Sequence, residues 1–181
     1  MSRLLYLALA SVLLGGILHI GTILLLPALA SRNIVPSFSA FGETGGFHLV
    51  PTGVSARKGL PLPDPQMALA ACAFSLADKA AHIKAALPRG FWSVSVYGPD
   101  GRNRFSLNDR SAGRGDLDLV LASSEQIAKL RVNPPATLEQ AIVTELPEVT
   151  GVVVLRALVG DESRRPEVEA ALAGAVCAAP V

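Results

Sequence analysis

The chain has 181 residues, of which 50% are hydrophobic, 17% are charged and 5% are aromatic, and its mean hydropathy is +0.43. Arg3 is the only charged side chain before residue 27, so residues 27–181 carry 15 of the 16 Lys and Arg against 15 Asp and Glu. The zero net charge of residues 27–181 excludes a basic nucleic-acid-binding domain, because such a domain must neutralise phosphates with Lys and Arg. The apolar content excludes a wholly disordered chain.

An uncharged apolar run extends from Leu4 to Leu26, with only Ser11, His19 and Thr22 as polar residues. At about 1.5 Å per residue, a helix over this range spans roughly 35 Å, which exceeds the roughly 30 Å of a bilayer's hydrocarbon core. A helix satisfies every backbone polar group internally, as lipid requires. We therefore expect residues 4–26 to cross a lipid bilayer as a single-pass anchor, with Pro27 ending the helix.

The few charges that flank this run indicate its orientation. Arg3 precedes it and Arg32 follows it, and the positive-inside rule favours a cytoplasmic N-terminus. Ala28-Leu29-Ala30 before Ser31 has the small-x-small form of a signal-peptidase site, so cleavage after Ala30 is the alternative. The run is longer than the roughly 7–15 apolar residues of a secretory signal, which favours a retained anchor. Both interpretations place the remaining domain outside the cytoplasm.

The chain contains two cysteines, Cys72 and Cys177, near the start and end of the expected folded region. In an exported domain, a sole pair is a disulfide candidate. The alternative is two buried thiols, because Cys behaves as a small hydrophobe. No Cys-x-x-Cys motif is present, so the sequence offers no zinc ribbon or thioredoxin-type site.

Three regions are expected: an anchor or signal over 1–30, a linker over 31–66, and an exported domain over 67–181. The linker is rich in Pro and Gly, which disfavour helices and central strands. Part of it is expected to pack on the domain, because apolar side chains recur within it: Phe38, Phe41, Phe47 and Leu49.

Short apolar or alternating runs predict strands at 69–76, 81–85, 91–97, 103–107, 117–122, 141–145 and 151–159. In the 91–97 run, Trp92, Val94 and Val96 share one face. Gly98-Pro99-Asp100-Gly101 has turn composition, so the 91–97 and 103–107 strands should form a hairpin.

Two helices are expected at the periphery of these strands. One begins at Ser123 or Ser124 and extends through Leu130. The other follows Pro166 and carries its apolar residues as far as Cys177. These elements predict an α+β protein, in which an N-terminal transmembrane helix precedes a single β-rich, sandwich-like exported domain with a C-terminal helix.

Candidate chemistry is concentrated between residues 97 and 118, where Asn, Asp, Ser and Arg are frequent. Asp109, Asp116 and Asp118 are candidates for paired carboxylates, but no spacing fixes their separation, and turns commonly carry Asn and Asp. The spacing of a calcium loop, the nucleophile elbow of a serine hydrolase and the glycine-rich phosphate loops are all missing. We therefore expect no metal and no cofactor.

One stretch carries a resemblance to known proteins. Phe91-Trp92-Ser93-Val94-Ser95-Val96-Tyr97, then Asp100-Gly101, Asn103 and Ser106-Leu107-Asn108-Asp109-Arg110, resembles an uncharacterised family of bacterial envelope proteins, a domain of unknown function. The resemblance implies one membrane helix, a Pro/Gly linker and a periplasmic domain with a Cys near each end, anchored in the inner membrane. It also implies similarity to a segment of larger exported proteins with β-sandwich-like domains. It brings no activity, because the family has none established.

These observations favour a non-enzymatic envelope protein whose exported domain binds a small ligand or a protein partner. The hairpin would be its contact surface, with these candidate ligand residues: Trp92, Tyr97, Asn103, Ser106, Asn108, Asp109 and Arg110. One alternative is a membrane-tethered hydrolase or isomerase that uses the polar 97–118 loop. Another is an assembly subunit that pairs through its membrane helix.

Overall fold

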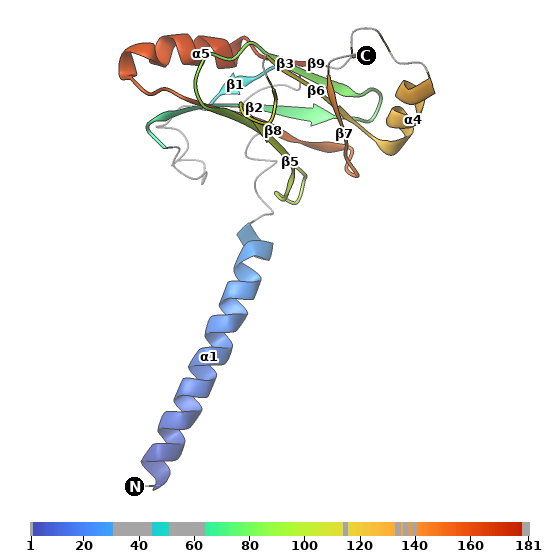
Figure 1. Ribbon diagram of the computed structural model, residues 1–181. Coiled ribbons are helices and arrows are strands. Elements are labelled where there is room, and N and C mark those ends of the chain that lie inside the picture. The colour runs from blue at the N-terminus through green and yellow to red at the C-terminus, as the bar shows by residue number, and fades with distance from the viewer. Residues whose placement is uncertain are drawn as a thin grey trace.

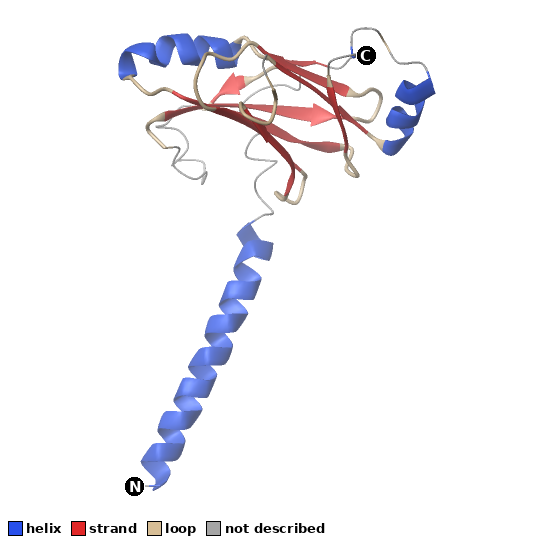
Figure 2. Cartoon of the chain, in the orientation of Figure 1, coloured by secondary structure: helices blue, strands red, loops and turns tan. Residues whose placement is uncertain are grey.

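The computed structural model describes residues 2–30, 45–50, 64–113, 116–132, 135, 138 and 141–178. It contains an N-terminal apolar helix, two β-sheets and a helix near the C-terminus, which confirms the predicted α+β class (Figures 1 and 2). Most of the predicted linker, with Phe38 and Phe41, lies outside the described residues.

Helix α1 spans Ser2–Ala30 and is long and apolar enough over Arg3–Leu26 to cross a membrane, as an anchor or as part of a signal sequence. Two of its hydroxyl groups bond within the helix: Ser11 donates to the Leu7 carbonyl and Thr22 to the Leu18 carbonyl, both at 2.8 Å. The prediction that Pro27 ends the helix is wrong. A proline removes one backbone donor, and the strong helix formers Ala28, Leu29 and Ala30 continue the last turn beyond it.

The domain is built from two open sheets. The five-stranded sheet has the order β1 (His48–Leu49), β2 (Met67–Ser75), β8 (Thr150–Leu158), β4 (Trp92–Tyr97), β5 (Asn103–Asn108), and every neighbouring pair is antiparallel. The four-stranded sheet has the order β7 (Ile142–Glu145), β6 (Leu117–Ala122), β3 (Ala81–Ala85), β9 (Val176–Ala178), and only its β6–β7 pair is parallel. All seven predicted strands are present, with ends displaced by up to two residues.

The core lies between the inner faces of the two sheets. Alternate residues of each strand point into it, as the period of two requires. Ile83, Leu119 and Leu121 of the four-stranded sheet meet Val94 and Leu155 of the five-stranded sheet, and all five are 0% exposed. This burial explains why the central strands are rich in Val and Leu.

The disulfide connects the two sheets. Cys72 of β2 is bonded to Cys177 of β9, 105 residues apart in the sequence, and both side chains are buried. This confirms the predicted pair. Disulfides persist in oxidising compartments, so the bond agrees with a domain outside the cytosol.

Two short strands were not predicted. β1 pairs with β2, and the preceding Gly46 forms a bridge with Val176 of β9, so the segment Gly45–Val50 runs between the edges of the two sheets. Phe47 of this segment is buried in the core and Leu49 is partly buried against it, as expected from their apolar character. A strand of only two residues, such as β1, shows no detectable alternation of apolar and polar residues in the sequence.

Helix α4 (Ser124–Val132) begins with a capping box. The Gln126 backbone N–H donates to the Ser123 hydroxyl (3.3 Å), and the Ser123 N–H donates to the Gln126 side-chain oxygen (2.9 Å). Ile127 and Leu130 then pack on Val120, on the outer face of the four-stranded sheet. The predicted helix is confirmed and continues two residues further.

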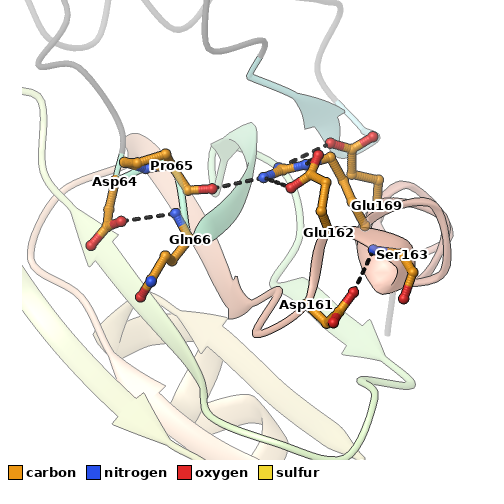
Figure 3. Close-up of polar contacts among 8 residues, drawn as sticks. Asp64, Pro65, Gln66, Asp161, Glu162, Ser163 and Glu169 are labelled. Atoms are coloured by element: carbon orange, nitrogen blue, oxygen red, sulfur yellow. Dashed lines mark hydrogen bonds and ion pairs between the residues drawn. The ribbon is translucent and has the colours of Figure 1, made fainter.

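Helix α5 (Arg165–Ala173) follows a short 3₁₀ turn, η4 (Glu162–Arg164), and packs against β1, β2 and β8. Arg165 fixes its start: the guanidinium lies 2.6 Å from Glu162 Oε1 and donates to the Pro65 carbonyl at 2.7 Å (Figure 3). The prediction that this helix reaches Cys177 is wrong. It ends at Ala173, with Gly174 as its C-cap, and Cys177 lies in strand β9 because it pairs with Ile83 of β3.

We expect loss of the disulfide to destabilise the domain substantially. Closing a loop of 105 residues stabilises a fold by about 4 to 5 kcal/mol in the chain-entropy model. The double variant Cys72→Ala, Cys177→Ala should lose free energy of unfolding of this order, measured by urea titration of Trp92 fluorescence. Reducing agent should destabilise the wild type and leave the double variant unchanged; equal urea midpoints for the two proteins would contradict the prediction.

Gly151 at the start of β8 allows two neighbours to approach closely. A Cβ there would lie 2.4 Å from the Tyr97 carbonyl oxygen and 2.6 Å from the Phe74 ring. We expect Gly151→Ala to lower the free energy of unfolding by about 1 to 3 kcal/mol, the usual range for overpacking. Gly46→Ala is the matched control, since its Cβ would meet nothing within 4 Å. Similar stability losses in both variants would show that the close approach is unimportant.

Candidate functional site on the β4–β5 hairpin

The hairpin turns at the predicted residues. The Gly101 N–H donates to the Gly98 carbonyl at 2.9 Å, and Gly101 has a φ of +74°, which a glycine adopts without strain. The Asp100 carboxylate accepts the Arg102 N–H at 3.0 Å. This confirms the turn between two paired strands, and it places β5 at an edge of the five-stranded sheet.

The two faces of β4 have different environments. Trp92, Val94 and Val96 point inward and belong to the core. Trp92 is 5% exposed, so this candidate ligand residue faces away from the polar side of the hairpin. Tyr97 and Ser95 occupy the opposite face by strand alternation.

Polar side chains of β4, β5 and β8 form a connected group on this outer face, in which Ser95 is buried while Asn103 and Ser106 are exposed. We call Ser95, Tyr97, Asn103, Ser106 and Arg156 the polar row. The Asn103 amide donates to the Ser106 hydroxyl at 2.6 Å, and that hydroxyl donates to Ser95 at 3.3 Å. The structure thus brings three predicted candidates, Tyr97, Asn103 and Ser106, onto one face.

Arg156 joins the row from β8 and is not among the residues predicted for the site. It lies opposite Ser93 in the sheet register, and its guanidinium donates to the Tyr97 hydroxyl at 3.2 Å. A single Arg within the apolar strand Thr150–Leu158 was the available signal. The sequence could not show that Arg156 contacts Tyr97, because this contact depends on the pairing of β4 with β8.

Asn108 stabilises the turn that follows β5. Its side-chain oxygen accepts the backbone N–H groups of Arg110 (3.1 Å) and Ser111 (3.0 Å). The Asp109 backbone N–H donates to the Trp92 carbonyl, while one of its carboxylate oxygens is buried without a partner among the described residues. The Arg110 side chain is exposed. These three candidates lie at the opposite end of β5 from the Gly98–Gly101 turn.

A cluster of ion pairs fixes the turn between β4 and β5 to the loop before β8. The Arg104 guanidinium lies 2.9 Å from Asp100 and also pairs with Glu148. The hydrogen bond to Glu148 is the main cause that raises the pKa of Arg104, and the Asp100 charge adds to it. The pKa of Asp100 is lowered, chiefly by the Arg102 N–H and then by the Arg104 charge. These ion pairs therefore fix the position of the turn at the end of the hairpin, where the polar row begins.

The remaining carboxylates are distributed over other parts of the domain. Asp118 lies on β6 of the four-stranded sheet, 2.6 Å from His82 Nε2 and 3.5 Å from Lys84 Nζ. Its contacts therefore belong to the sheet that does not contain the hairpin. Within the part of the chain that the structure describes, no cluster of three or more His, Cys, Asp or Glu side chains is arranged to hold a metal.

The Asp100 carboxylate makes the hairpin sensitive to acid. Its lowered pKa means that it stabilises the folded state above the ordinary value of 3.8, and that this contribution is lost as the pH falls through its lower folded-state pKa. We expect Asp100→Asn to lose less stability than the wild type between about pH 6 and about pH 2, measured by urea unfolding. Asp78→Asn, at an exposed position, is the control. Parallel curves for Asp100→Asn and the wild type would contradict this.

Comparison with known proteins identifies the fold and no function. No protein-family model and no curated protein matches the chain. The VPA0106 protein from Vibrio parahaemolyticus has a similar structure, with a TM-score of 0.57 and 10% sequence identity over 82% of this chain and 36% of that one. An uncharacterised protein from Burkholderia cenocepacia aligns with a TM-score of 0.44 and 17% identity over 62% of this chain and 31% of its own. The chain thus spans about a third of the length of these solved structures.

Proposed function

We propose that this chain is a single-pass protein of the bacterial envelope whose exported domain binds a polar ligand or a segment of a partner protein. The polar row is the single observation that carries the binding proposal. It places hydroxyl, amide and guanidinium groups of three adjacent strands on one face, where strand pairing holds them in fixed relative positions. Preorganised donors and acceptors of this kind lower the entropic cost of binding.

The proposed location in the bacterial envelope has separate support. Helix α1 has the length and composition of a membrane span, and the disulfide agrees with an oxidising compartment. The stretch from Phe91 to Arg110 resembles envelope proteins of unknown function. A retained helix would tether the domain to the inner membrane with the polar row in the periplasm.

The row offers more hydrogen-bonding groups than charges. Arg156 is its only ionised member, and its guanidinium already contacts the Tyr97 hydroxyl. A partner therefore gains mainly neutral hydrogen bonds, together with one cation suited to a carboxylate or a backbone carbonyl. This chemistry fits a peptide segment or a small hydroxylated ligand better than a polyanion.

A photo-crosslinking side chain placed at Ser106 tests the proposal in the full chain, expressed in the native cell. We expect an adduct at this position and none at Lys129, a 73% exposed residue on α4 that serves as the control site. Arg156→Ala should reduce the Ser106 adduct at least several-fold, because it removes the only cation of the row. Equal labelling at both positions, or an adduct insensitive to Arg156→Ala, would refute binding at this face.

A further inference from the structure

An exposed apolar patch adjoins the polar row on the outer face of the five-stranded sheet. Met67 of β2 lies opposite Leu158 of β8, and the Leu158 N–H donates to the Phe91 carbonyl at 2.9 Å. Since Trp92 faces the core, strand alternation places Phe91 on the outer face beside Leu158. Phe91 is 45% exposed and Leu158 is 39% exposed. We call Met67, Phe91 and Leu158 the apolar patch.

The described residues beyond α1 expose few other large apolar side chains. These are four valines on four different segments: Val132, Val143, Val149 and Val176. Single exposed apolar residues are normal on a protein surface, whereas adjacent ones are typical of a contact surface. The apolar patch is therefore a candidate extension of the binding site.

Arg156 lies on the same face as the apolar patch, in the next row of the sheet. It is two residues before Leu158 on β8, so the two side chains point to the same side. Val154 lies between Arg156 and Tyr97 in the strand register, and it is 3% exposed. The bond to the Tyr97 hydroxyl is the only hydrogen bond of the guanidinium within the described residues. A guanidinium has five N–H donors, so most of them remain available for a ligand.

Arg156 has no carboxylate partner among the described residues. Other arginines of the domain do form ion pairs: Arg102, Arg104, Arg164 and Arg165. Arg156 is partly buried, where an unpaired charge costs more free energy than in water. Two exposed carboxylates lie beyond the apolar patch, and backbone N–H groups occupy both of them. Asp64 accepts the Gln66 N–H at 2.8 Å. Asp161 accepts the Ser163 N–H at 2.8 Å (Figure 3).

We infer that the site of the proposed function takes an extended peptide segment with a carboxylate side chain and a large apolar side chain on the same side. The carboxylate pairs with Arg156, and the apolar side chain packs on Phe91 and Leu158. Residues i and i+2 of an extended segment point the same way about 7 Å apart, which matches the spacing of neighbouring rows on β8. The inference rests on the proposed function, because Arg156 belongs to the polar row, and it names the chemistry of the partner.

An anionic lipid surface fits these residues less well. Asp64 and Asp161 are exposed beyond the apolar patch and would repel a plane of phosphates. A single carboxylate side chain meets Arg156 without approaching them, because Arg156 lies on the other side of the apolar patch. The neutral groups of the polar row, such as those of Asn103 and Ser106, suit the backbone amides of the same segment.

Calorimetric titration of the full chain in lipid nanodiscs tests this chemistry. The probe is the hexapeptide acetyl-Gly-Ser-Glu-Ser-Phe-Ser-amide, whose ends carry no charge. We expect it to bind, and to bind about tenfold more weakly when Gln replaces its Glu or Ser replaces its Phe, because each change removes one of the two contacts. Arg156→Gln should abolish the preference for Glu, whereas Arg131→Gln, at an exposed position on α4, should retain it.

Three outcomes of the titration would overturn the inference. The first is equal affinity for the Glu and Gln peptides, and the second is no binding at millimolar concentration. The third is loss of peptide binding when phosphatidylglycerol is added to the nanodiscs, which would show that lipid occupies the site.

The crosslinking experiment at Ser106 separates this inference from the proposed function. Phe91→Ser should reduce the adduct several-fold, while Val132→Ser, at a position 87% exposed on α4, should leave it unchanged. An adduct that depends on Arg156 but not on Phe91 would show this inference to be wrong and leave the proposed function intact. If Phe91→Ser fails to fold, Leu158→Ser makes the same test of the apolar patch.

Discussion

The fold depends on one requirement: each open sheet must bury its inner face against the other. The residues that meet between them, such as Ile83, Leu119, Val94 and Leu155, are fully buried, and the Cys72–Cys177 bond crosses the same space. Non-polar burial supplies most of the stability of such a domain, while the disulfide restricts its unfolded chain. The outer faces carry smaller apolar clusters, around Val152 on the five-stranded sheet and Val120 on the four-stranded sheet, and polar groups gather on the outer side of the hairpin. The site and the sheet edges then follow from how these two layers are assembled.

Strand β4 connects this core to the candidate contact surface. Its inward residues Val94 and Val96 are part of the core, while Ser95 and Tyr97 belong to the polar row on its other face. The row therefore lies on a strand whose other face belongs to the core, and β8 contributes Arg156 through the same strand pairing. The Arg104–Glu148 pair adds a second constraint, because it fixes the hairpin to the loop that leads into β8. Under the proposed function, a partner would meet side chains that are already ordered, which lowers the entropic cost of binding.

If α1 remains in the membrane, the polar row is confined to two dimensions. Under the proposed function, this confinement favours even weak pairing with another membrane-bound protein by raising the effective concentration.

Local sequence patterns predicted most elements of this protein, with the exception of the short strands β1 and β9. The uncharged run before Pro27, the alternation around Trp92 and the turn at Gly98–Gly101 are local patterns, and the corresponding helix, strand and turn are present. Which elements are neighbours became known from the fold alone. It moved Cys177 from the end of a helix to strand β9, removed Trp92 from the site and added Arg156 to it. Strand pairing and layer packing join residues far apart in the chain, and a local pattern carries no information about such partners.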